Sequence, residues 1–189
     1  MSQAKTLSPA EIEQVLAYIA TRRFALRNRV MVLVSFWSGM RVGEIASLKV
    51  GDVANTDGTV KAEVRLSAEQ TKGRQPRTVF LSEKLRVELQ RYLDLRRAYT
   101  DPAQILFVTA GSKAFTANGL ALHFFWLYRK AGIAGASSHS GRRSFITNLA
   151  AKGIGVRVLA SLAGHRSIAV TQKYIDVNDD MKRNAVELI

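Results

Sequence analysis

The sequence predicts an α+β fold that is mainly helical, with one small antiparallel three-stranded sheet inserted early in the chain. Over most of the chain, apolar residues recur every three to four positions, which is typical of amphipathic helices. Between Val60 and Leu81 the pattern changes to near-alternation, which is typical of short strands. The 189 residues contain no repeat and no proline-rich linker, so we expect one domain that is large enough to bury a core.

The N-terminal third is predicted to form three helices. Residues 1–6 are expected to be a flexible lead-in, after which Ser8 begins a capping box that Glu11 completes, with proline at the first helical position. The first helix follows this box. A second helix is expected over about 26–38, where a glycine ends it, and a short third helix over about 42–48.

The middle of the chain is predicted to form a hairpin and then a helix. The hairpin turn is expected at 71–76, and a helix resumes after a Ser82 cap. The run 105–109 is predicted to be a short strand or a buried link. From Thr116 onward the pattern is helical again, with a possible joint at the glycine-containing segment 132–137. The leucines expected to face the core after Ser82 are Leu85, Leu89, Leu93 and Leu95.

The composition points to a polyanionic partner. Lys and Arg number 28 against 15 Asp and Glu, which gives a formal net charge of +13. This excess favours nucleic acid or an acidic membrane surface. The apolar fraction of 47% is typical of a folded globular domain and excludes a disordered basic tail.

Other site classes are excluded by what the sequence lacks. Cysteine is absent, so disulfides and thiolate zinc sites are impossible, and the three histidines lack the spacing of metal ligands. No metal or cofactor is therefore expected. The N-terminus has no signal-peptide pattern, and the longest apolar run, 30–37, is far too short to span a bilayer. We expect a soluble cytoplasmic protein that does not bind a membrane.

Six polar residues stand beside turns or glycines within otherwise apolar surroundings. Taken singly, each has an ordinary structural reading, such as a helix end, a charged hairpin turn or a half-buried core tyrosine. Their order along the chain is far more specific: Arg, Lys, His-x-x-Arg, His, Tyr. The six are Arg41, Lys72, His139, Arg142, His165 and Tyr174.

This order, with the local sequences SGMRVGEIASL, SSHSGRRSF and LAGHRS, resembles the catalytic signature of the tyrosine recombinases of the phage-integrase type. The resemblance covers about residues 7–177, which we take as one catalytic domain followed by a tail helix at 178–189. It implies the catalytic-domain fold of that family and a site-specific DNA recombinase of integrase or invertase type. Such an enzyme cleaves and rejoins DNA through a covalent 3′-phosphotyrosyl intermediate and needs neither metal nor ATP.

Two positions depart from the family's pattern. Gly141 stands where leucine most often precedes the second arginine, and Arg143 follows where histidine is frequent. A glycine inside a helix costs about 1 kcal/mol relative to alanine, so the packing of this helix comes into question. The chain also begins where the catalytic domain normally begins, without the family's usual N-terminal DNA-clamping domain. Both a naturally minimal recombinase and a fragment of a longer integrase fit this observation.

The chemistry of a phosphodiester explains the choice of residue types. Attack builds negative charge on the non-bridging oxygens, and the paired donors of Arg41 and Arg142 suit these oxygens. Stabilising such charge is usually the largest catalytic term, so losing either arginine is expected to cost about a hundredfold or more in rate. Tyr174 would be the nucleophile, and a tyrosine hydroxyl needs a base or nearby cations to attack at neutral pH.

The resemblance implies roles for the other residues. Lys72, on the hairpin turn, would protonate the leaving 5′-oxygen, and His139 would assist by acid-base catalysis. His165 would hydrogen-bond a non-bridging oxygen in the transition state. Glu44, at the acidic position of the first arginine motif, would either orient Arg41 or cap the turn.

The expected partner is double-stranded DNA, bound by a homo-oligomer that is a tetramer in the synapse. The tail helix has an apolar stripe of Met181, Ala185, Leu188 and Ile189, which would pack on its own core or on a neighbouring protomer. The family implies a bacterial, phage or mobile-element origin and a nucleoid location. The candidates for phosphate contacts are Arg74, Arg77, Lys113, Lys130, Arg143, Arg166 and Lys173.

Two alternatives stay open at this point. Residues 156–175 also resemble a helix-turn-helix, which would suit a DNA-binding regulator without catalysis. In such a regulator, Arg41 and Lys72 have no reason to converge on Tyr174. Type IB topoisomerases use similar chemistry without exchanging strands between sites, but their motif contexts resemble this chain much less.

Overall fold

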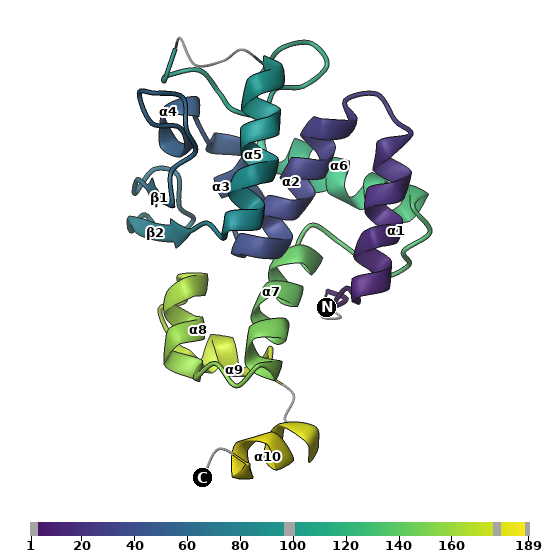
Figure 1. The fold of residues 1–189 in the computed structure, drawn as a ribbon, viewed down its shortest axis with the longest axis vertical. Helices are drawn as coiled ribbons and strands as arrows, with labels where there is room; N and C mark the ends of the chain where they lie inside the picture. Colours follow the sequence, from purple (N-terminus) through teal and green to yellow (C-terminus); the bar gives the residue numbers. More distant parts are fainter. Residues whose placement is uncertain (1–3, 97–100, 176–178, 188–189) are drawn as a thin grey trace.

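The computed structural model describes residues 4–96, 101–175 and 179–187, and over these ranges the fold is mainly helical (Figure 1). The Ser8 capping box forms as predicted, and Gly39 ends the second helix in the left-handed region with φ +66°. The short fourth helix was not predicted from the sequence. The first four helices are α1 Pro9–Ala20, α2 Ala25–Ser38, α3 Val42–Ser47 and α4 Val50–Val53.

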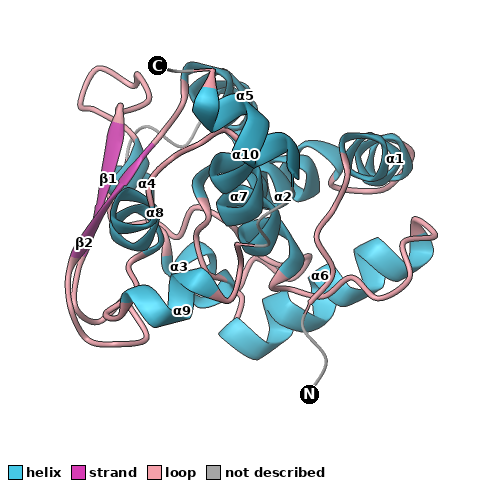
Figure 2. Ribbon diagram, turned by 90° about the horizontal axis from the view of Figure 1, so that it is seen from below, coloured by secondary structure: helices cyan, strands magenta, loops and turns pink. Residues whose placement is uncertain are grey.

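A small antiparallel sheet follows α4 and consists of β1 Glu63–Leu66 and β2 Arg77–Phe80. In its register Val64 lies opposite Val79, and both side chains are buried. The turn between the strands carries Lys72. Figure 2 shows the sheet at one edge of the molecule with α8 beside it, and α8 contacts β2.

The prediction of a three-stranded sheet is wrong for the part of the chain that the structure describes. The segment before β1 makes only an isolated bridge between Ala54 and Val60. A tight turn closes this bridge, since the backbone N–H of Asn55 donates to the carbonyl of Thr59 at 2.8 Å. The residues before Ala54 form helix α4, so too few extended residues precede this turn to make a third strand.

Helix α5, Glu83–Arg96, packs on α2, and one of its residues predicted to face the core is instead exposed. Three of the four expected leucines are buried, but Leu95 is 69% exposed. Tyr92 is buried in its place and stacks on Phe107, with ring centroids 5.3 Å apart. Residues two positions apart lie about 200° apart around a helix, so Leu95 points almost opposite to the buried Leu93 and stands at the edge of the buried stripe. Phe107 belongs to the run 105–109, which is a buried link joined to its neighbours by isolated bridges.

The C-terminal half is helical as predicted. Helix α7 packs against α2 and extends from the larger group of helices to α8 and α9 (Figure 1). The segment 132–137 before it is packed rather than loose, since Ile133 and Ala136 are buried. The elements are α6 Ala117–Lys130, α7 Ser140–Ala151, α8 Val156–Ala163, α9 Ile168–Gln172 and α10 Asp179–Val186.

The close packing of α7 on α2 explains the unusual glycine. A Cβ atom built on Gly141 would lie 2.5 Å from Ser35 Oγ and 3.2 Å from the backbone nitrogen of Phe36. A larger side chain at this position would push the two helices apart. Gly141 therefore permits the close contact with α2 that holds α7 in place.

The chain's two ends are described only in part. Residues 4–8 lead into α1 without helix or strand, and residues 1–3 of the predicted lead-in lie outside the described residues. In the tail, Ala185 is exposed, whereas Asn178, Leu188, Ile189 and the Met181 side chain lie outside the described residues. Among the residues that the structure describes, no helix is long and apolar enough to cross a membrane.

Candidate active site

The carboxylate of Glu44 joins two arginines at the start of α3. It is 1% exposed, and its oxygens accept from Arg41 Nη1 at 2.9 Å and from Arg77 Nη2 at 2.7 Å. It also accepts from the backbone N–H of Arg41 at 2.8 Å. Both predicted roles of Glu44 are therefore present, because it orients Arg41 and caps the turn. Burial alone would raise the pKa of Glu44, but the bonds and charges of Arg77 and then Arg41 hold it below its ordinary value.

Three arginines bind the last carbonyls of α8, one each. Arg77 Nη1 donates to the carbonyl of Leu162 at 2.9 Å, Arg142 Nη2 to that of Ala163 at 2.5 Å, and Arg41 Nη2 to that of Gly164 at 3.2 Å. The C-terminal carbonyls of a helix carry partial negative charge and lack partners within the helix. The end of α8 therefore gathers guanidinium groups from α3, β2 and α7.

Gly164 permits this arrangement. It ends α8 in the left-handed region with φ +62°, and a Cβ atom built on it would lie 2.6 Å from Arg77 Cδ. A side chain at this position would be strained and would displace Arg77.

Arg142 is the most deeply buried of these cations. It is 4% exposed, and Nη1 donates to the carbonyl of Gly39 at 2.5 Å. Burial, followed by the charges of Arg41 and Arg77, lowers the pKa of Arg142 to about 9. The guanidinium is thus still protonated at neutral pH, and the ends of α2 and α8 fix its orientation.

The ring of His165 lies between Arg142 and Thr171. Its Nε2 is 2.9 Å from Arg142 Nη2, and its Nδ1 is 2.9 Å from the hydroxyl oxygen of Thr171. A guanidinium only donates, so Nε2 accepts and Nδ1 carries the proton. Burial, followed by the charges of Arg142, Arg41 and Arg77, lowers the pKa of His165 to about 4, which agrees with a neutral ring.

Tyr174 follows α9 and lies against this histidine. The rings of His165 and Tyr174 are stacked, with centroids 5.7 Å apart and an angle of 19° between their planes. The guanidinium of Arg143 lies 5.4 Å from the centroid of the Tyr174 ring. The Thr147 hydroxyl donates to the carbonyl of Tyr174 at 3.2 Å, so α7 holds the tyrosine segment through both ring and backbone.

Two neighbouring cavities contain the predicted residues that face solvent. One, of about 500 Å³, is lined by Arg41, Lys72 and His165 among others. The second, of about 310 Å³, is lined by His139 and Tyr174, and both cavities share Val170. The structure thus brings together six residues that are spread over 134 positions of the chain, from Arg41 to Tyr174.

His139 caps the N-terminal end of α7, three residues before Arg142. Its side chain is exposed toward the second cavity. Partial desolvation, followed by the charges of Arg142, Lys72 and Arg41, lowers the pKa of His139. A neutral imidazole at this position can accept a proton.

The predicted phosphate-contacting residues differ in their surroundings. Arg166 lies by the hairpin turn and donates to the carbonyl of Gly73 at 2.6 Å, next to the exposed Arg74. Arg77 is engaged by Glu44 and by the carbonyl of Leu162, so its donors face the protein interior. The others with exposed side chains are Lys113, Lys130 and Lys173, while Arg143 is half-buried.

Sequence reasoning missed two residues that hold this cluster together. Thr171 is fully buried and contacts His165, and Arg77 joins β2 to both α3 and α8. A threonine six residues after a histidine gives no signal of its own. Arg77 was predicted from the sequence only as a candidate phosphate contact, and nothing in the pattern pointed to Glu44.

The two helices of the helix-turn-helix alternative do form, as α8 and α9. However, α9 has only five residues, and its Thr171 side chain points to His165 rather than outward. In addition, Arg41 and Lys72 line the same cavity as His165, and Tyr174 stacks on His165. A non-catalytic regulator would not require these residues to lie together.

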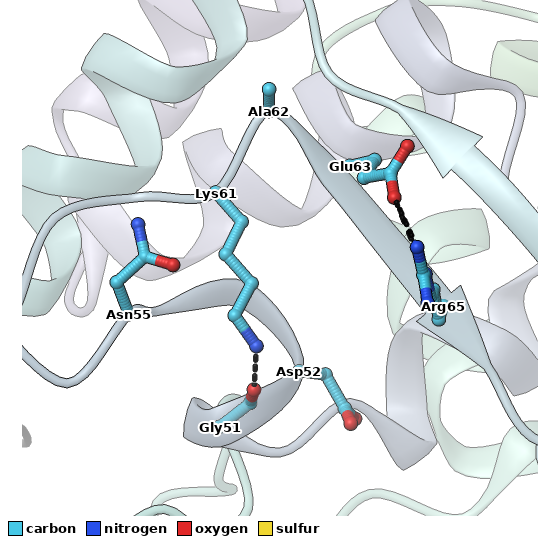
Figure 3. A pocket seen from close by; sticks show the side chains of 7 residues that line it. All are labelled: Gly51, Asp52, Asn55, Lys61, Ala62, Glu63 and Arg65. Atoms are coloured by element: carbon cyan, nitrogen blue, oxygen red, sulfur yellow. Dashed lines mark hydrogen bonds and ion pairs between the residues drawn. The ribbon is translucent and has the colours of Figure 1, made fainter.

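Another hollow, drawn in Figure 3, lies at α4 and the start of β1, away from the six residues. Lys61 Nζ donates there to the carbonyl of Gly51 at 2.5 Å, and Glu63 pairs with Arg65. Lys61 is thus bonded to a backbone carbonyl and Glu63 is paired with Arg65, so we assign no chemistry to this hollow.

The fold is mainly helical, and its candidate site places Tyr174 against His165, which in turn contacts the buried Arg142. The chain belongs to the phage integrase family, whose sequence profile matches residues 5–181.

Named relatives refine the comparison. The chain is 31% identical over 188 residues to the tyrosine recombinase XerA of Pyrococcus furiosus, covering 97% of this chain and 61% of that protein. It is 34% identical over 183 residues to the tyrosine recombinase XerD of Ralstonia nicotianae, covering 92% and 56% respectively. The crystal structure of a XerA recombinase matches the whole chain and 66% of its own, with 27% identity and a TM-score of 0.79. The chain thus spans less than two thirds of these relatives.

Proposed function

We propose that this chain is the catalytic part of a site-specific DNA recombinase that cleaves and rejoins strands through Tyr174. The observation that carries the proposal is the stacking of Tyr174 on His165, which is itself bonded to the buried Arg142. The named relatives are tyrosine recombinases, which agrees with this chemistry.

In the proposed reaction, the Tyr174 oxygen attacks the scissile phosphorus and the bond to the 5′-oxygen breaks. The phenolic proton passes to a base, for which the neutral His139 is suited, and Lys72 gives a proton to the leaving oxygen. The phosphotyrosyl bond keeps the energy needed for religation, so the reverse attack by a 5′-hydroxyl restores the strand.

Arg41 and Arg142 would bind the non-bridging oxygens. Both are oriented by carbonyls of the α8 end, so their remaining donors need little reorganisation when charge develops on the phosphate. His165 would bond to the same phosphate. Since its Nε2 accepts from Arg142, that bond requires the proton to move to Nε2 or the ring to turn.

Double-stranded DNA is the proposed substrate, and phosphate contacts would dominate its binding, as the net charge of +13 favours. We further propose assembly of several copies on DNA, a tetramer in the synapse, with the tail helix docking on a neighbouring copy. Deleting residues 179–189 should then weaken assembly on DNA while cleavage of single strands stays detectable. Unchanged assembly would contradict this role of the tail. A nucleoid location follows from the same proposal.

The test of the reaction uses a pool of nicked duplexes with random sequence, because the target site is unknown. Incubation without metal or ATP should give a covalent protein–DNA adduct on a denaturing gel, and the Tyr174→Phe variant should give none. Binding without any adduct would instead favour the non-catalytic DNA-binding regulator.

A further inference from the structure

Arg143 connects the tyrosine to the segment that precedes α1. Its Nε donates to the Thr6 hydroxyl oxygen at 3.0 Å, and its guanidinium carbon lies 5.4 Å from the centre of the Tyr174 ring. The side chain is half-buried. A planar guanidinium can bind a ring through its face while its edge donates hydrogen bonds, so both contacts are compatible.

The neighbouring residues fix this segment to α7. The backbone N–H of Leu7 donates to the Ser144 hydroxyl at 2.7 Å, and Leu7 is 1% exposed. That hydroxyl in turn donates to the carbonyl of Ser140 at 2.9 Å. Thr6 and Leu7 are therefore held by two successive residues of the helix that begins beside His139.

The same segment forms part of the wall around the tyrosine. Ala4 lines the 310 Å³ cavity together with Arg143, Lys173 and Tyr174. The residues before α1 thus do more than lead into the first helix, because they close one side of the cavity that contains the proposed nucleophile.

We propose that Arg143 is a positioning residue for Tyr174, anchored by Thr6, rather than a contact to DNA phosphate. This inference rests on the proposed nucleophilic role of Tyr174. Arg143 holds the phenol ring against His165, and the bond to Thr6 holds Arg143. Any movement of the chain before α1 is thereby transmitted to the tyrosine.

The first test separates positioning from phosphate binding. Arg143→Gln should lower the rate of adduct formation at saturating nicked DNA by roughly tenfold, which is the scale of one lost cation–π contact. Its affinity for DNA, and the dependence of that affinity on salt, should match those of Lys152→Gln, which removes an exposed charge at the end of the same helix. Arg143→Lys should recover part of the rate, because it keeps the charge.

Thr6→Val provides the second variant, because it removes the acceptor and leaves Arg143 in place. It should lower the rate severalfold in the wild-type background and have no further effect in the Arg143→Gln background, since both changes break one connection. An unchanged rate at saturation, with a salt dependence reduced by one phosphate contact, would show that Arg143 binds DNA and would overturn the inference.

A DNA-free measurement tests the inference even if no adduct forms. Tetranitromethane nitrates exposed tyrosine rings, and mass spectrometry of peptides gives the rate at each tyrosine. Arg143→Gln and Thr6→Val should each raise the nitration rate of Tyr174 relative to Tyr18, which serves as the internal reference.

Thermal unfolding followed by circular dichroism confirms that both variants fold. Equal rates in wild type and both variants would overturn the positioning role, whereas a Tyr174→Phe variant that still forms the adduct would overturn the proposed nucleophile.

Discussion

The imidazole of His165 lies nearly parallel to the phenol ring of Tyr174, with ring centroids 5.7 Å apart. This contact joins the end of α8 to the segment after α9. Because His165 also contacts the buried Arg142, a single ring connects the proposed nucleophile to the proposed phosphate-binding arginine.

The first prediction concerns pH. The pKa of His165 falls from an ordinary 6.5 to about 4 in the folded chain, so the folded state prefers the neutral ring. Its contribution to the free energy of unfolding is fully present above pH 6.5 and is lost as the pH falls toward 4. Urea unfolding at a series of pH values should show this decline, and His165→Gln should make it shallower.

His123 supplies the control for this experiment. Its pKa is also lowered to about 4, by burial and then by the charge of Arg27, far from Tyr174 in the sequence. The His123→Gln variant should remove a separate part of the decline. If the free energy of unfolding declines equally with pH in wild type and His165→Gln, the His165 ring is not held neutral with Nε2 as an acceptor.

The second prediction concerns the buried carboxylate. Glu44→Gln leaves Arg41 and Arg77 without their counter-charge, and removing one partner of a buried ion pair costs about 3–5 kcal/mol. Chemical denaturation should show a loss of this size. The matched change Glu63→Gln breaks an exposed pair with Arg65 and should change stability by about 0.5 kcal/mol or less. Similar losses in the two variants would show that Glu44 has no special role.

The third prediction separates Arg77 from Arg166. Arg77 is engaged by Glu44 and by the end of α8, so Arg77→Gln should lower the melting temperature. The same variant should leave the slope of log DNA affinity against log salt concentration unchanged. Arg166→Gln removes an exposed charge beside the hairpin turn and should flatten that slope by about 0.9. An equal flattening by Arg77→Gln would restore it as a phosphate contact.

The fourth prediction concerns Gly141. Alanine favours helix by about 1 kcal/mol over glycine, yet Gly141→Ala should destabilise the chain by about 1–3 kcal/mol, because its Cβ would meet Ser35. In a double-mutant cycle, Ser35→Gly should recover much of this loss. Strictly additive effects would rule out the contact between α2 and α7 as the cause.

Most of the helices could be predicted because they leave local signals, and the structure brings the six proposed site residues together. The Ser8 capping box, the Gly39 stop and the spacing of His139 and Arg142 are all read within a few residues. The order of the six motifs then supplied the long-range information that no single motif holds.

What failed depends on tertiary contacts. Leu95 continued an apparent leucine repeat, but it lies two residues after the buried Leu93 and therefore points to the other side of the helix. The predicted third strand is reduced to one bridge because the residues directly before Ala54 are helical, in α4. Arg77 was proposed as a phosphate contact, and its ion pair with Glu44 could not be foreseen because nothing nearby in the sequence marks a residue 33 positions earlier as its partner.

The proposed reaction is best tested by identifying the residue that becomes joined to the DNA. After reaction with the nicked duplex pool, the adduct is digested with nuclease and protease, and the modified peptide is sequenced by mass spectrometry. The expected product is a nucleotide joined through its 3′-phosphate to the Tyr174 oxygen. Attachment to any other residue, or through a 5′-phosphate, would contradict the proposed reaction.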